Sequence, residues 1–436
     1  MWEHLLDIGT VLVVVGVPAL YLFVRSRGSK KAAATLRQSI DRGRDQPVSL
    51  HPVIDPNRCI GSGACVKACP EKNVLGLIES RGALISPANC IGHGMCAAAC
   101  PVQAITLVFG TEKRGVDIPH VNGAFETNLH GLYIAGELGG MGLIRNAMIQ
   151  GREATEYISM SLHDVRREEG VYDLVIVGAG PAGVSATITA KKEGLKALTL
   201  DREDLAGTIL TYPRNKVVMS HGLEIPEYGK LKPRRILKED LLALIQEVWT
   251  RLSLSVQPHE EVTDISKVDE TFSITTTKGE YRAYRVLLAI GRRGSPRKLG
   301  VPGELSGKVY YRLLEPEAFS GSRICVVGGG DSAVEAAVAL SSDTSNDVTL
   351  VHRSESCSRA REENVELLEE AVKLGRLKTR FNSSITNIEQ ESITINGPDG
   401  EARLPNDHVF VFIGGELPTA FLNRIGVQFT RKFGER

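Results

Sequence analysis

The chain has 436 residues, and its 52 Lys and Arg balance 52 Asp and Glu, so the formal net charge at pH 7 is +0. This length exceeds one ordinary hydrophobic core and predicts two or three domains. The balanced charge, without a basic stripe, excludes the electrostatic surface of a nucleic-acid-binding protein. Much of the glycine lies in tight clusters, which is typical of phosphate-binding turns in α/β proteins.

An apolar run, LLDIGTVLVVVGVPALYLFV, covers residues 5–24 and carries one charge, at Asp7. About 20 such residues are enough to span a bilayer. Basic residues follow the run at Arg25, Arg27, Lys30 and Lys31. The positive-inside rule therefore predicts a single-pass anchor at residues 1–25 in the inner (cytoplasmic) membrane, with the rest of the chain cytoplasmic. A cleaved signal peptide and a buried helix are the less favoured alternatives.

Residues 26–50 are polar and basic and predict a linker or a surface helix. Beyond them, residues 51–110 contain an internal repeat, CIGSGACVKACP from Cys59 and CIGHGMCAAACP from Cys90. The spacing follows the C-x2-C-x2-C-x3-C-P run of bacterial ferredoxins, except that the second cysteine is replaced by Ser62 in one copy and His93 in the other. The clustering of cysteines in this short stretch favours metal over a disulfide framework.

In the ferredoxin pattern the fourth cysteine of each run serves the other cluster. Two sets of thiolates are then expected, Cys59, Cys65 and Cys100 for one cluster and Cys69, Cys90 and Cys96 for the other. Each set is one thiolate short, so Ser62 and His93 either complete a four-iron cluster or face a three-iron cluster.

For Ser62 both readings stay open, whereas for His93 ligation is favoured. A neutral imidazole in place of a thiolate should raise the reduction potential of that cluster and make it the better electron sink. Two zinc sites are the disfavoured alternative, because zinc usually takes four protein ligands.

A charged segment at 161–170 predicts a linker, and the strand DLVIVG that follows runs into a G-x-G-x-x-G turn that opens a helix. This context predicts a dinucleotide-binding loop with the pyrophosphate at the helix N-terminus. Asp201 ends the next strand, where a carboxylate would hold ribose hydroxyls. The predicted loop residues are Gly178, Gly180, Pro181, Ala182 and Gly183.

A second strand, turn and helix, VVGGGDSAVEAA, predicts a second dinucleotide site, and the pair suggests FAD plus NAD(P)H. The alternative is one working site and one relic. The strand after it ends in VHRSESCSRAR without an acidic residue, so the cations there slightly favour NADP over NAD. The predicted site residues are Gly328, Gly330, Asp331, Ser332, Ala333, Arg353 and Arg359, with His352 and Arg361 nearby.

The phrases GAGPAG, AIGRRGSPRKLGVPGE and GGGDSAVEAA with VHR occur in the order seen in the thioredoxin-reductase-like pyridine nucleotide flavoproteins, which the chain resembles from about residue 111 to its end. In that family a phrase like TNVPGLYAAGD near the C-terminus closes the FAD site. Here the matching phrase, ETNLHGLYIAGELGG at 126–140, precedes the first glycine motif. The flavoprotein therefore resembles a circular permutation of the family.

The resemblance implies an α/β fold with two Rossmann-like domains, joined here to a small α+β two-cluster ferredoxin domain and one transmembrane helix. It implies cofactor contacts at Gly136 and Gly291, and at Glu137, which stands where the family has aspartate. The expected segments are 111–160 (closing segment of the FAD domain), 171–299 (FAD), 300–405 (NAD(P)) and 406–436 (return into the FAD domain).

The family's disulfide reductases carry a Cys-x-x-Cys pair, and this chain has none. Cys325 is expected to be a buried small hydrophobe and Cys357 a loop thiol without a catalytic role. Dithiol exchange is therefore disfavoured.

The sequence predicts an oxidoreductase in which nicotinamide and FAD carry the hydride chemistry and no side chain acts as acid or nucleophile. Two iron-sulfur clusters, [4Fe-4S] or [3Fe-4S], would pass single electrons to a quinone-linked complex, a cytochrome or a ferredoxin, in a direction left open. Assembly as a homodimer is compatible with the sequence, and nucleic acid is not expected as a partner. The rival class is a structural or redox- or iron-sensing subunit of a membrane complex.

Overall fold

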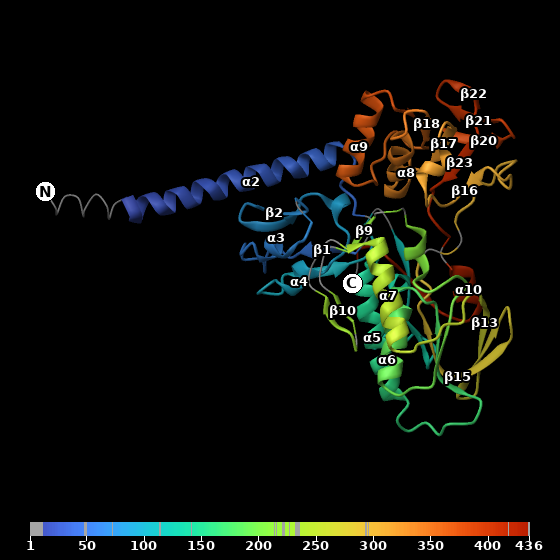
Figure 1. The fold of residues 1–436 in the computed structure, drawn as a ribbon. Coiled ribbons are helices and arrows are strands. Elements are labelled where there is room, and N and C mark those ends of the chain that lie inside the picture. The colour runs from blue at the N-terminus through green and yellow to red at the C-terminus, as the bar shows by residue number, and fades with distance from the viewer. Residues whose placement is uncertain are drawn as a thin grey trace. The chain divides into compact units, whose positions relative to one another are not determined.

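The computed structural model describes residues 12–47, 50–71, 73–112, 115–140, 142–212, 214, 216–219, 223–225, 227–231, 236–292, 294, 296–416 and 418–434. The chain divides into two compact units, which Figure 1 shows as a ribbon. The N-terminal unit comprises Met1–Gly115 with Lys432–Arg436, and the dinucleotide unit comprises Val116–Arg431.

A long helix opens the described part of the N-terminal unit, with a π-helical turn η1 (Leu12–Gly16) followed by α2 (Val17–Asp41). Its C-terminal half is tied to the rest of the unit, because Ala32 is buried and the Ser39 hydroxyl donates to the Ile85 carbonyl at 3.0 Å. Residues 26–41 are therefore helical. Of the two structures predicted for residues 26–50, these residues form the helix and not the linker.

The predicted membrane anchor falls only partly within the described residues, because residues 1–11 lie outside them. In the part of the chain that the structure describes, no helix combines the length and the apolar character needed to cross a bilayer.

The rest of the N-terminal unit has the twofold pattern that the repeat predicts. Strand β1 (His51–Ile54) pairs antiparallel with β4 (Ile105–Val108), and β2 (Leu75–Ile78) forms a hairpin with β3 (Arg81–Leu84). Each cysteine run contains a short helix that starts after a glycine with positive φ. These helices are α3 (Ala64–Ala68) and α4 (Met95–Ala98), and a 3-10 turn, η2 (Pro87–Asn89), precedes the second run.

The dinucleotide unit contains a first, mixed sheet in the order β13-β14-β15-β7-β8, with β6 also paired to β15. Strands β6, β7 and β8 run parallel to one another and to β15, while β13 and β14 add an antiparallel hairpin. The bounds are β6 (Leu132–Ile134), β7 (Tyr172–Val177), β8 (Ala197–Leu200), β13 (Val262–Val268), β14 (Thr271–Thr276) and β15 (Glu280–Leu288). Strand β6 precedes β7 in the chain, so the segment before the first glycine motif forms part of this sheet.

Two helices of the dinucleotide unit, α5 (Ile144–Ser161) and α6 (Pro181–Lys192), pack closely against each other. The fully apolar stretches of β7 and β15 explain why these strands are central, since a strand covered on both faces buries every side chain.

The second sheet is parallel, in the order β16-β23-β17-β18-β19. Its strands are β16 (Val309–Tyr310), β17 (Arg323–Val327), β18 (Asp347–Val351), β19 (Leu377–Arg380) and β23 (His408–Val411), with helices α8 (Asp331–Ser341) and α9 (Glu362–Lys373). A separate antiparallel sheet contains β20 (Ser384–Ile388), β21 (Ser392–Gly397) and β22 (Gly400–Pro405).

Shorter elements complete the dinucleotide unit. Paired strands are β5 (Val116–Pro119) with β24 (Phe429–Lys432), β9 (Val217–Met219) with β12 (Ile236–Leu237), and β10 (Leu223–Ile225) with β11 (Gly229–Leu231). The helical elements are η3 (Glu137–Gly139), η4 (Gly207–Thr211), α7 (Lys238–Arg251), η5 (Pro316–Phe319) and α10 (Thr419–Arg424).

The C-terminal segment 406–436 differs from the sequence prediction, which assigned all of it to the FAD domain. Its first strand, β23, pairs with β17 in the second sheet, because the apolar residues of β23 fill a central parallel position. Only then does the chain reach the core of the first sheet, with Leu422, Ile425 and Val427. The last residues, from Lys432, belong to the N-terminal unit.

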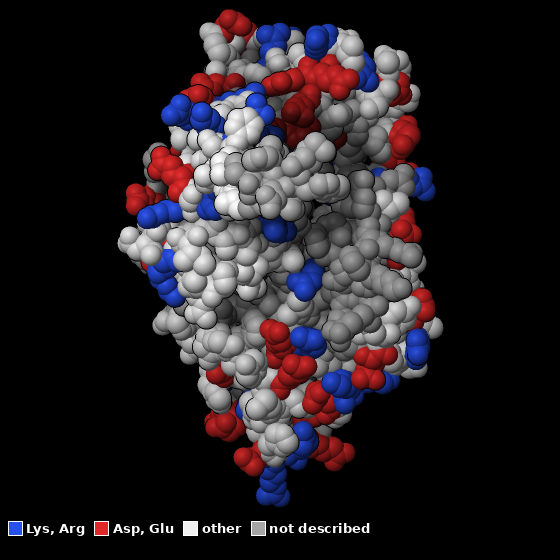
Figure 2. Space-filling view, turned by 90° about the vertical axis from the view of Figure 1, so that its left-hand side faces the viewer, with Lys and Arg blue, Asp and Glu red and all other residues white. Residues whose placement is uncertain are grey.

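Charged side chains of both signs are interspersed on the face shown in Figure 2. This mixture agrees with the balanced composition of the chain.

Candidate cofactor sites

A cavity of about 480 Å³ in the dinucleotide unit brings together the two glycine motifs and the segment at 126–140, which precedes the first of them. Its walls come from η3, the loop before α6, the end of β8, the loop before α8 and the segment after β23. The predicted residues that line it are Gly136, Glu137, Gly178, Gly180, Pro181, Ala182, Asp201, Gly291, Gly330, Asp331 and Ser332.

The glycines of the first loop have two different tasks. Gly178 has φ +106°, and a Cβ there would lie 2.6 Å from the Ala289 carbonyl oxygen, while a Cβ on Gly183 would lie 1.8 Å from the Gly178 carbonyl oxygen. These two positions therefore require glycine for packing. Gly180 has no atom within 4 Å of a Cβ position, so the backbone at the start of α6 is open to a ligand. This is the arrangement that admits a pyrophosphate to a helix N-terminus.

Asp201 lies just beyond β8 and is fixed by the phosphate loop itself. Its two carboxylate oxygens accept hydrogen bonds from the backbone N–H of Ala179 at 2.5 Å and of Glu203 at 2.7 Å. Burial raises the pKa of Asp201. Each oxygen keeps a further lone pair, so the carboxylate can still accept from ribose hydroxyls.

The closing segment is held at the cavity by α5, a contact that the sequence analysis missed. The backbone N–H of Gly136 donates to Oε1 of the buried Gln150 at 2.8 Å. Gly151 lies so close to α6 that a Cβ would meet the Ala182 carbonyl oxygen at 2.0 Å. The signal available in the sequence was a lone glycine inside a helical pattern, which often marks close packing.

Glu137 lines the same cavity, and its Oε1 lies 3.4 Å from the position of a Cβ on Gly142. Because Glu137 and the first glycine loop share one cavity, the carboxylate is placed where it could accept hydrogen bonds from the hydroxyls of a bound flavin side chain.

The second loop, like the first, has one glycine that is closely packed and one that is open to the cavity. Gly328 has φ +145° and is closely approached by the Phe412 carbonyl oxygen and by the Cβ of Ala333, whereas Gly330 is open. Asp331 accepts hydrogen bonds from the backbone N–H of Arg361 and from Nδ2 of Asn364, both at 2.7 Å. Gly328 and Ala333 thus pack the loop, and Gly330 faces the cavity.

Basic side chains lie close together in the sequence after β18, which follows the second glycine loop and its helix. The ring of His352 covers Gly329, where a Cβ would lie 2.3 Å from its Nε2. The pKa of His352 is lowered by burial and by the charges of Arg353 and Arg359, so both guanidinium groups are near it. Arg353 and Arg359 are exposed and do not form the cavity wall.

In the N-terminal unit the cysteines fall into the two crossed triads. Burial raises the pKa of Cys65, and so do the neighbouring Cys59 and Cys100. We call these three cysteines triad A. The groups bordering them include Gly82, whose N–H donates to Sγ of Cys59 at 3.3 Å, and Ala104, whose N–H donates to Sγ of Cys100 at 3.3 Å.

The second set, Cys69, Cys90 and Cys96, is called triad B. Burial raises the pKa of Cys96 to about 11, with further contributions from Cys90 and Cys69. Convergent thiols with backbone N–H donors to sulfur fit an iron-sulfur cluster, because such donors stabilise the negative charge of cluster sulfurs. Among the described residues, no group of three or more His, Cys, Asp or Glu is arranged to hold a metal ion.

The two substituted positions differ in their surroundings. Ser62 is exposed and borders the small cavity at triad A, where its Oγ accepts from the N–H of Ala64 at 3.4 Å. The side chain of His93 is largely covered, and its Nε2 lies 3.9 Å from Oε1 of Glu71.

The remaining cysteines are buried in the dinucleotide unit. Burial raises the pKa of Cys325 to about 12 and that of Cys357 to about 11. Cys357 packs in the core of the second sheet. It lies in a loop, as the sequence predicted, and it is buried in the same apolar cluster as Val334 and Leu368.

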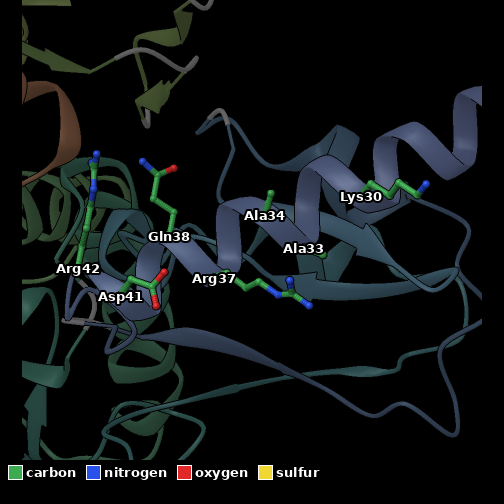
Figure 3. Close-up of a pocket in the computed structure, with 7 residues that line it drawn as sticks. All are labelled: Lys30, Ala33, Ala34, Arg37, Gln38, Asp41 and Arg42. Carbon is green, nitrogen blue, oxygen red and sulfur yellow. The ribbon is translucent and has the colours of Figure 1, made fainter.

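A groove of about 590 Å³ runs along α2, and Figure 3 shows the side chains that line it. They are Lys30, Ala33, Ala34, Arg37, Gln38 and Asp41 of α2 and Arg42, which directly follows the helix. The groove contains no glycine loop and no cysteine, so it is not a candidate cofactor site.

A cavity shared by two glycine loops, each at the N-terminus of a helix that follows a parallel strand, is the arrangement typical of a flavoprotein that binds two dinucleotides. The comparisons with known proteins agree. A family model described as pyridine nucleotide-disulphide oxidoreductase matches residues 175–434, and a model described as a 4Fe-4S dicluster domain matches residues 51–101.

The chain is 32% identical over 268 residues to a ferredoxin–NADP reductase of Ignicoccus hospitalis. The matched stretch covers 60% of this chain and 83% of that protein. It is 27% identical over 265 residues to the bacilliredoxin reductase of Bacillus subtilis, covering 60% and 82%. The solved bacillithiol disulfide reductase of Staphylococcus aureus superposes with a TM-score of 0.54 at 26% identity, covering 59% of this chain and 80% of that one.

The chain therefore belongs to the pyridine nucleotide-disulphide oxidoreductase family. It is a flavin-dependent NAD(P)H oxidoreductase that also carries a 4Fe-4S ferredoxin domain, which confirms the predicted fold class and enzyme class at that level.

Proposed function

We propose that this enzyme passes electrons between NADP(H) and an electron-carrier partner through FAD and two iron-sulfur clusters on the same chain. The observation that carries the proposal is the pairing, in one polypeptide, of a cavity shared by two dinucleotide loops with two separate cysteine triads.

The residues of the chain bind and orient, and none is required as an acid or nucleophile. Gly180 and Gly330 open two helix N-termini to pyrophosphates, Asp201 and Glu137 offer carboxylates to hydroxyl groups, and Arg359 offers positive charge to a 2′-phosphate. A bound flavin supplies the conversion between two-electron hydride transfer and one-electron transfer.

Triads A and B would each hold one cluster. Ser62, exposed and accepting from the backbone of its own loop, favours a three-iron cluster at triad A. His93, largely covered, favours nitrogen ligation of a four-iron cluster at triad B.

The placement of β6 and η3 in the FAD half supports a circular permutation of the family fold. The match covers 83% of the Ignicoccus hospitalis protein and leaves about 17% of it unmatched. An unmatched part of this kind is expected if the closing segment stands at a different place in the present chain.

A membrane carrier, quinone-linked or cytochrome, remains part of the proposal together with a ferredoxin. The apolar run at 5–24 and the basic residues after it favour a partner at the inner membrane. The names of the relatives favour a ferredoxin.

Anaerobic stopped-flow spectroscopy tests the central claim. NADPH should bleach the flavin absorbance first and the cluster absorbance afterwards, both within the turnover time. A flavin that stays oxidised, or clusters that stay oxidised beside a reduced flavin, would refute the proposal.

Electron paramagnetic resonance of the wild type, Ser62→Ala and His93→Ala tests the cluster types. We expect the spectrum to change in His93→Ala and to stay unchanged in Ser62→Ala. Unchanged spectra in both variants would remove His93 as a ligand.

A further inference from the structure

The internal repeat allows the surfaces of the two cysteine runs to be compared position by position. Arg58 directly precedes the first run, and Lys67 lies within it. The equivalent positions of the second run hold Asn89 and Ala98, neither of which is charged. The first run therefore has two positive charges that the second run lacks.

The loop after the first cysteine also differs in exposure between the copies. Ile60 is 64% exposed, whereas its counterpart Ile91 is half-buried. Ser62 is exposed, while the side chain of its counterpart His93 is only 17% exposed. The loop that follows Cys59 of triad A is therefore open to solvent, and the equivalent loop of the second run is more covered.

Three cations lie on or beside this exposed loop. Nη2 of Arg58 donates to the carbonyl of Val102 at 3.1 Å, and Val102 borders the small cavity at triad A. Nη2 of Arg25, on α2, lies 3.2 Å from the position of a Cβ on Gly61. Lys67 is exposed on α3, the short helix within the same run.

The positive charge at the loop is only partly balanced by acidic residues. A Cβ on Gly61 would lie 1.8 Å from the carbonyl oxygen of Ser80, so the β2–β3 turn with the exposed Glu79 abuts the loop. In the part of the chain that the structure describes, no carboxylate forms an ion pair with Arg58 or Lys67. Both charges are therefore available to a partner.

We propose that this surface is the docking site for an acidic one-electron carrier protein of the ferredoxin type. We call it the docking surface, and its residues are Arg25, Arg58, Ile60, Ser62 and Lys67. The inference rests on the proposed function, since it requires a cluster at triad A. One electron passes between that cluster and the metal centre of the carrier, so that one is oxidised and the other reduced, and no bond or proton is exchanged.

The combination of an apolar residue with surrounding cations supports a protein partner. Electron-transfer complexes have small interfaces, and the core of an interface is apolar while its rim is polar. A single exposed isoleucine is ordinary on a protein surface, but Ile60 directly follows a cysteine of triad A and has Arg58 two residues before it. The cations would steer an acidic carrier to the loop that lies next to the cluster.

An anionic lipid surface would attract the same cations, but the docking surface suits a protein better. Membrane-surface binding needs a large apolar face in addition to positive charge. The docking surface offers one large apolar side chain, Ile60, together with the hydroxyl of Ser62. A lipid also accepts no electron, whereas a docked carrier would stand beside triad A.

Binding of an acidic plant-type ferredoxin to the full-length, cofactor-loaded protein tests the proposal, with isothermal titration calorimetry at low and high salt. Binding should weaken as salt rises. Arg58→Glu and Lys67→Glu should each raise Kd roughly fivefold or more at low salt, because reversed rim charges repel an acidic partner. Wild-type protein that does not bind this ferredoxin at low salt would overturn the proposal.

Arg37→Glu is the matched control, because Arg37 is an exposed arginine about 18 Å further along α2 than Arg25. It makes the same change in net charge and should leave Kd at the wild-type value. An equal rise of Kd in Arg37→Glu, or no rise in Arg58→Glu and Lys67→Glu, would overturn the docking surface.

Electron transfer gives a second readout that a merely structural effect would not reproduce. In Lys67→Glu the second-order rate constant for reduction of the ferredoxin should fall in step with its affinity, while the iron content and the rate at which NADPH reduces the protein's own flavin stay those of the wild type. A Lys67→Glu protein with full iron content and an unchanged rate constant toward the ferredoxin would contradict the proposal.

Vesicles of phosphatidylcholine and phosphatidylglycerol in equal amounts test the lipid alternative. Wild type, Arg58→Glu and Lys67→Glu should sediment with them to the same extent. Loss of vesicle binding in both variants together with an unchanged Kd for the ferredoxin would assign the surface to lipid and overturn the proposal.

Failure of the proposed function would look different. Wild-type protein without iron and acid-labile sulfide, or with clusters that NADPH does not reduce, would end the proposed function before any variant is made. Wild-type protein with reducible clusters and a Kd for the ferredoxin that neither Arg58→Glu nor Lys67→Glu changes would end only this inference.

Discussion

Glu304 shows how one buried carboxylate fixes the segment that leads from the first dinucleotide domain into the second. The side chain is 6% exposed and accepts hydrogen bonds from the N–H groups of Leu299 and Gly300 and from the hydroxyl of Tyr311. Burial alone would raise the pKa of Glu304, but these bonds lower it overall. The partner Tyr311 has its pKa raised to about 12 and stays protonated at neutral pH.

Glu304→Gln should therefore destabilise the protein by about 1–3 kcal/mol at pH 7, because buried donors lose a charged acceptor. A carboxylate with a lowered folded-state pKa stabilises the fold above its unfolded-state pKa, roughly 4.3, and this stability is lost as the pH falls through the folded-state value. Urea unfolding at pH 7, 5 and 4 should show the difference from wild type shrinking at the acid end.

The exposed Glu317→Gln serves as the control for this measurement, since it removes a carboxylate that lies in η5 and is exposed. A Glu304→Gln penalty that is the same at all three pH values would contradict the argument.

Arg359 is the residue that we propose sets the preference for NADP(H) over NAD(H). Arg359→Ala should lower kcat/KM for NADPH by about tenfold or more, because a charge-assisted contact to a 2′-phosphate is worth roughly 1.5–3 kcal/mol. The value for NADH should change little. Steady-state kinetics give kcat/KM for both coenzymes. Lys373→Ala, at an exposed position, is the control. Equal losses with NADH and NADPH would remove Arg359 from the 2′-phosphate site.

At the scale of elements, the FAD half depends on the close contact of α5 with α6. Helix α5 follows the segment at 126–140, and α6 carries the first glycine loop, so their contact joins two parts of the cavity wall. Gly151 permits it, because any Cβ there would collide with the Ala182 backbone.

Gly151→Ala should reduce the FAD content of the purified protein. It should also lower the free energy of unfolding by about 1–3 kcal/mol, because an added methyl group overpacks the contact. The helices must separate, and Ala182 at the start of α6 then moves. The flavin-to-protein absorbance ratio and thermal unfolding measure both effects. Gly279→Ala, at a turn where a Cβ would meet nothing within 4 Å, is the control. Full FAD occupancy in Gly151→Ala would show that the contact is not needed.

At the scale of the whole molecule, the two cofactor systems occupy separate units. Every described residue that lines the FAD cavity belongs to the dinucleotide unit, and all six cysteines of the triads lie in the N-terminal unit. Loss of a cluster should therefore leave the flavin site intact.

Cys65→Ser should lower the iron and acid-labile sulfide content while the flavin-to-protein ratio remains that of the wild type. The thiol is replaced at triad A, and no residue of the FAD cavity changes. Iron analysis and the flavin spectrum of the same sample measure the two quantities. A parallel loss of flavin would show that the units depend on each other for folding.

Local chemistry could be read directly from the sequence. A glycine loop such as that at Gly178–Gly183 binds phosphate through contiguous backbone, and a cysteine run binds iron through fixed short spacings, so each motif carries its own evidence. The two Rossmann-like domains and the ferredoxin module followed from these motifs and their order.

Contacts between distant segments required the tertiary structure. The sequence could not show that Gly151 touches Ala182, that His352 covers Gly329, or that Glu71 faces His93, because such contacts depend on how helices and loops pack. Motif spacing determines which groups a segment can offer to a cofactor, whereas packing between segments decides which of those groups meet at one site.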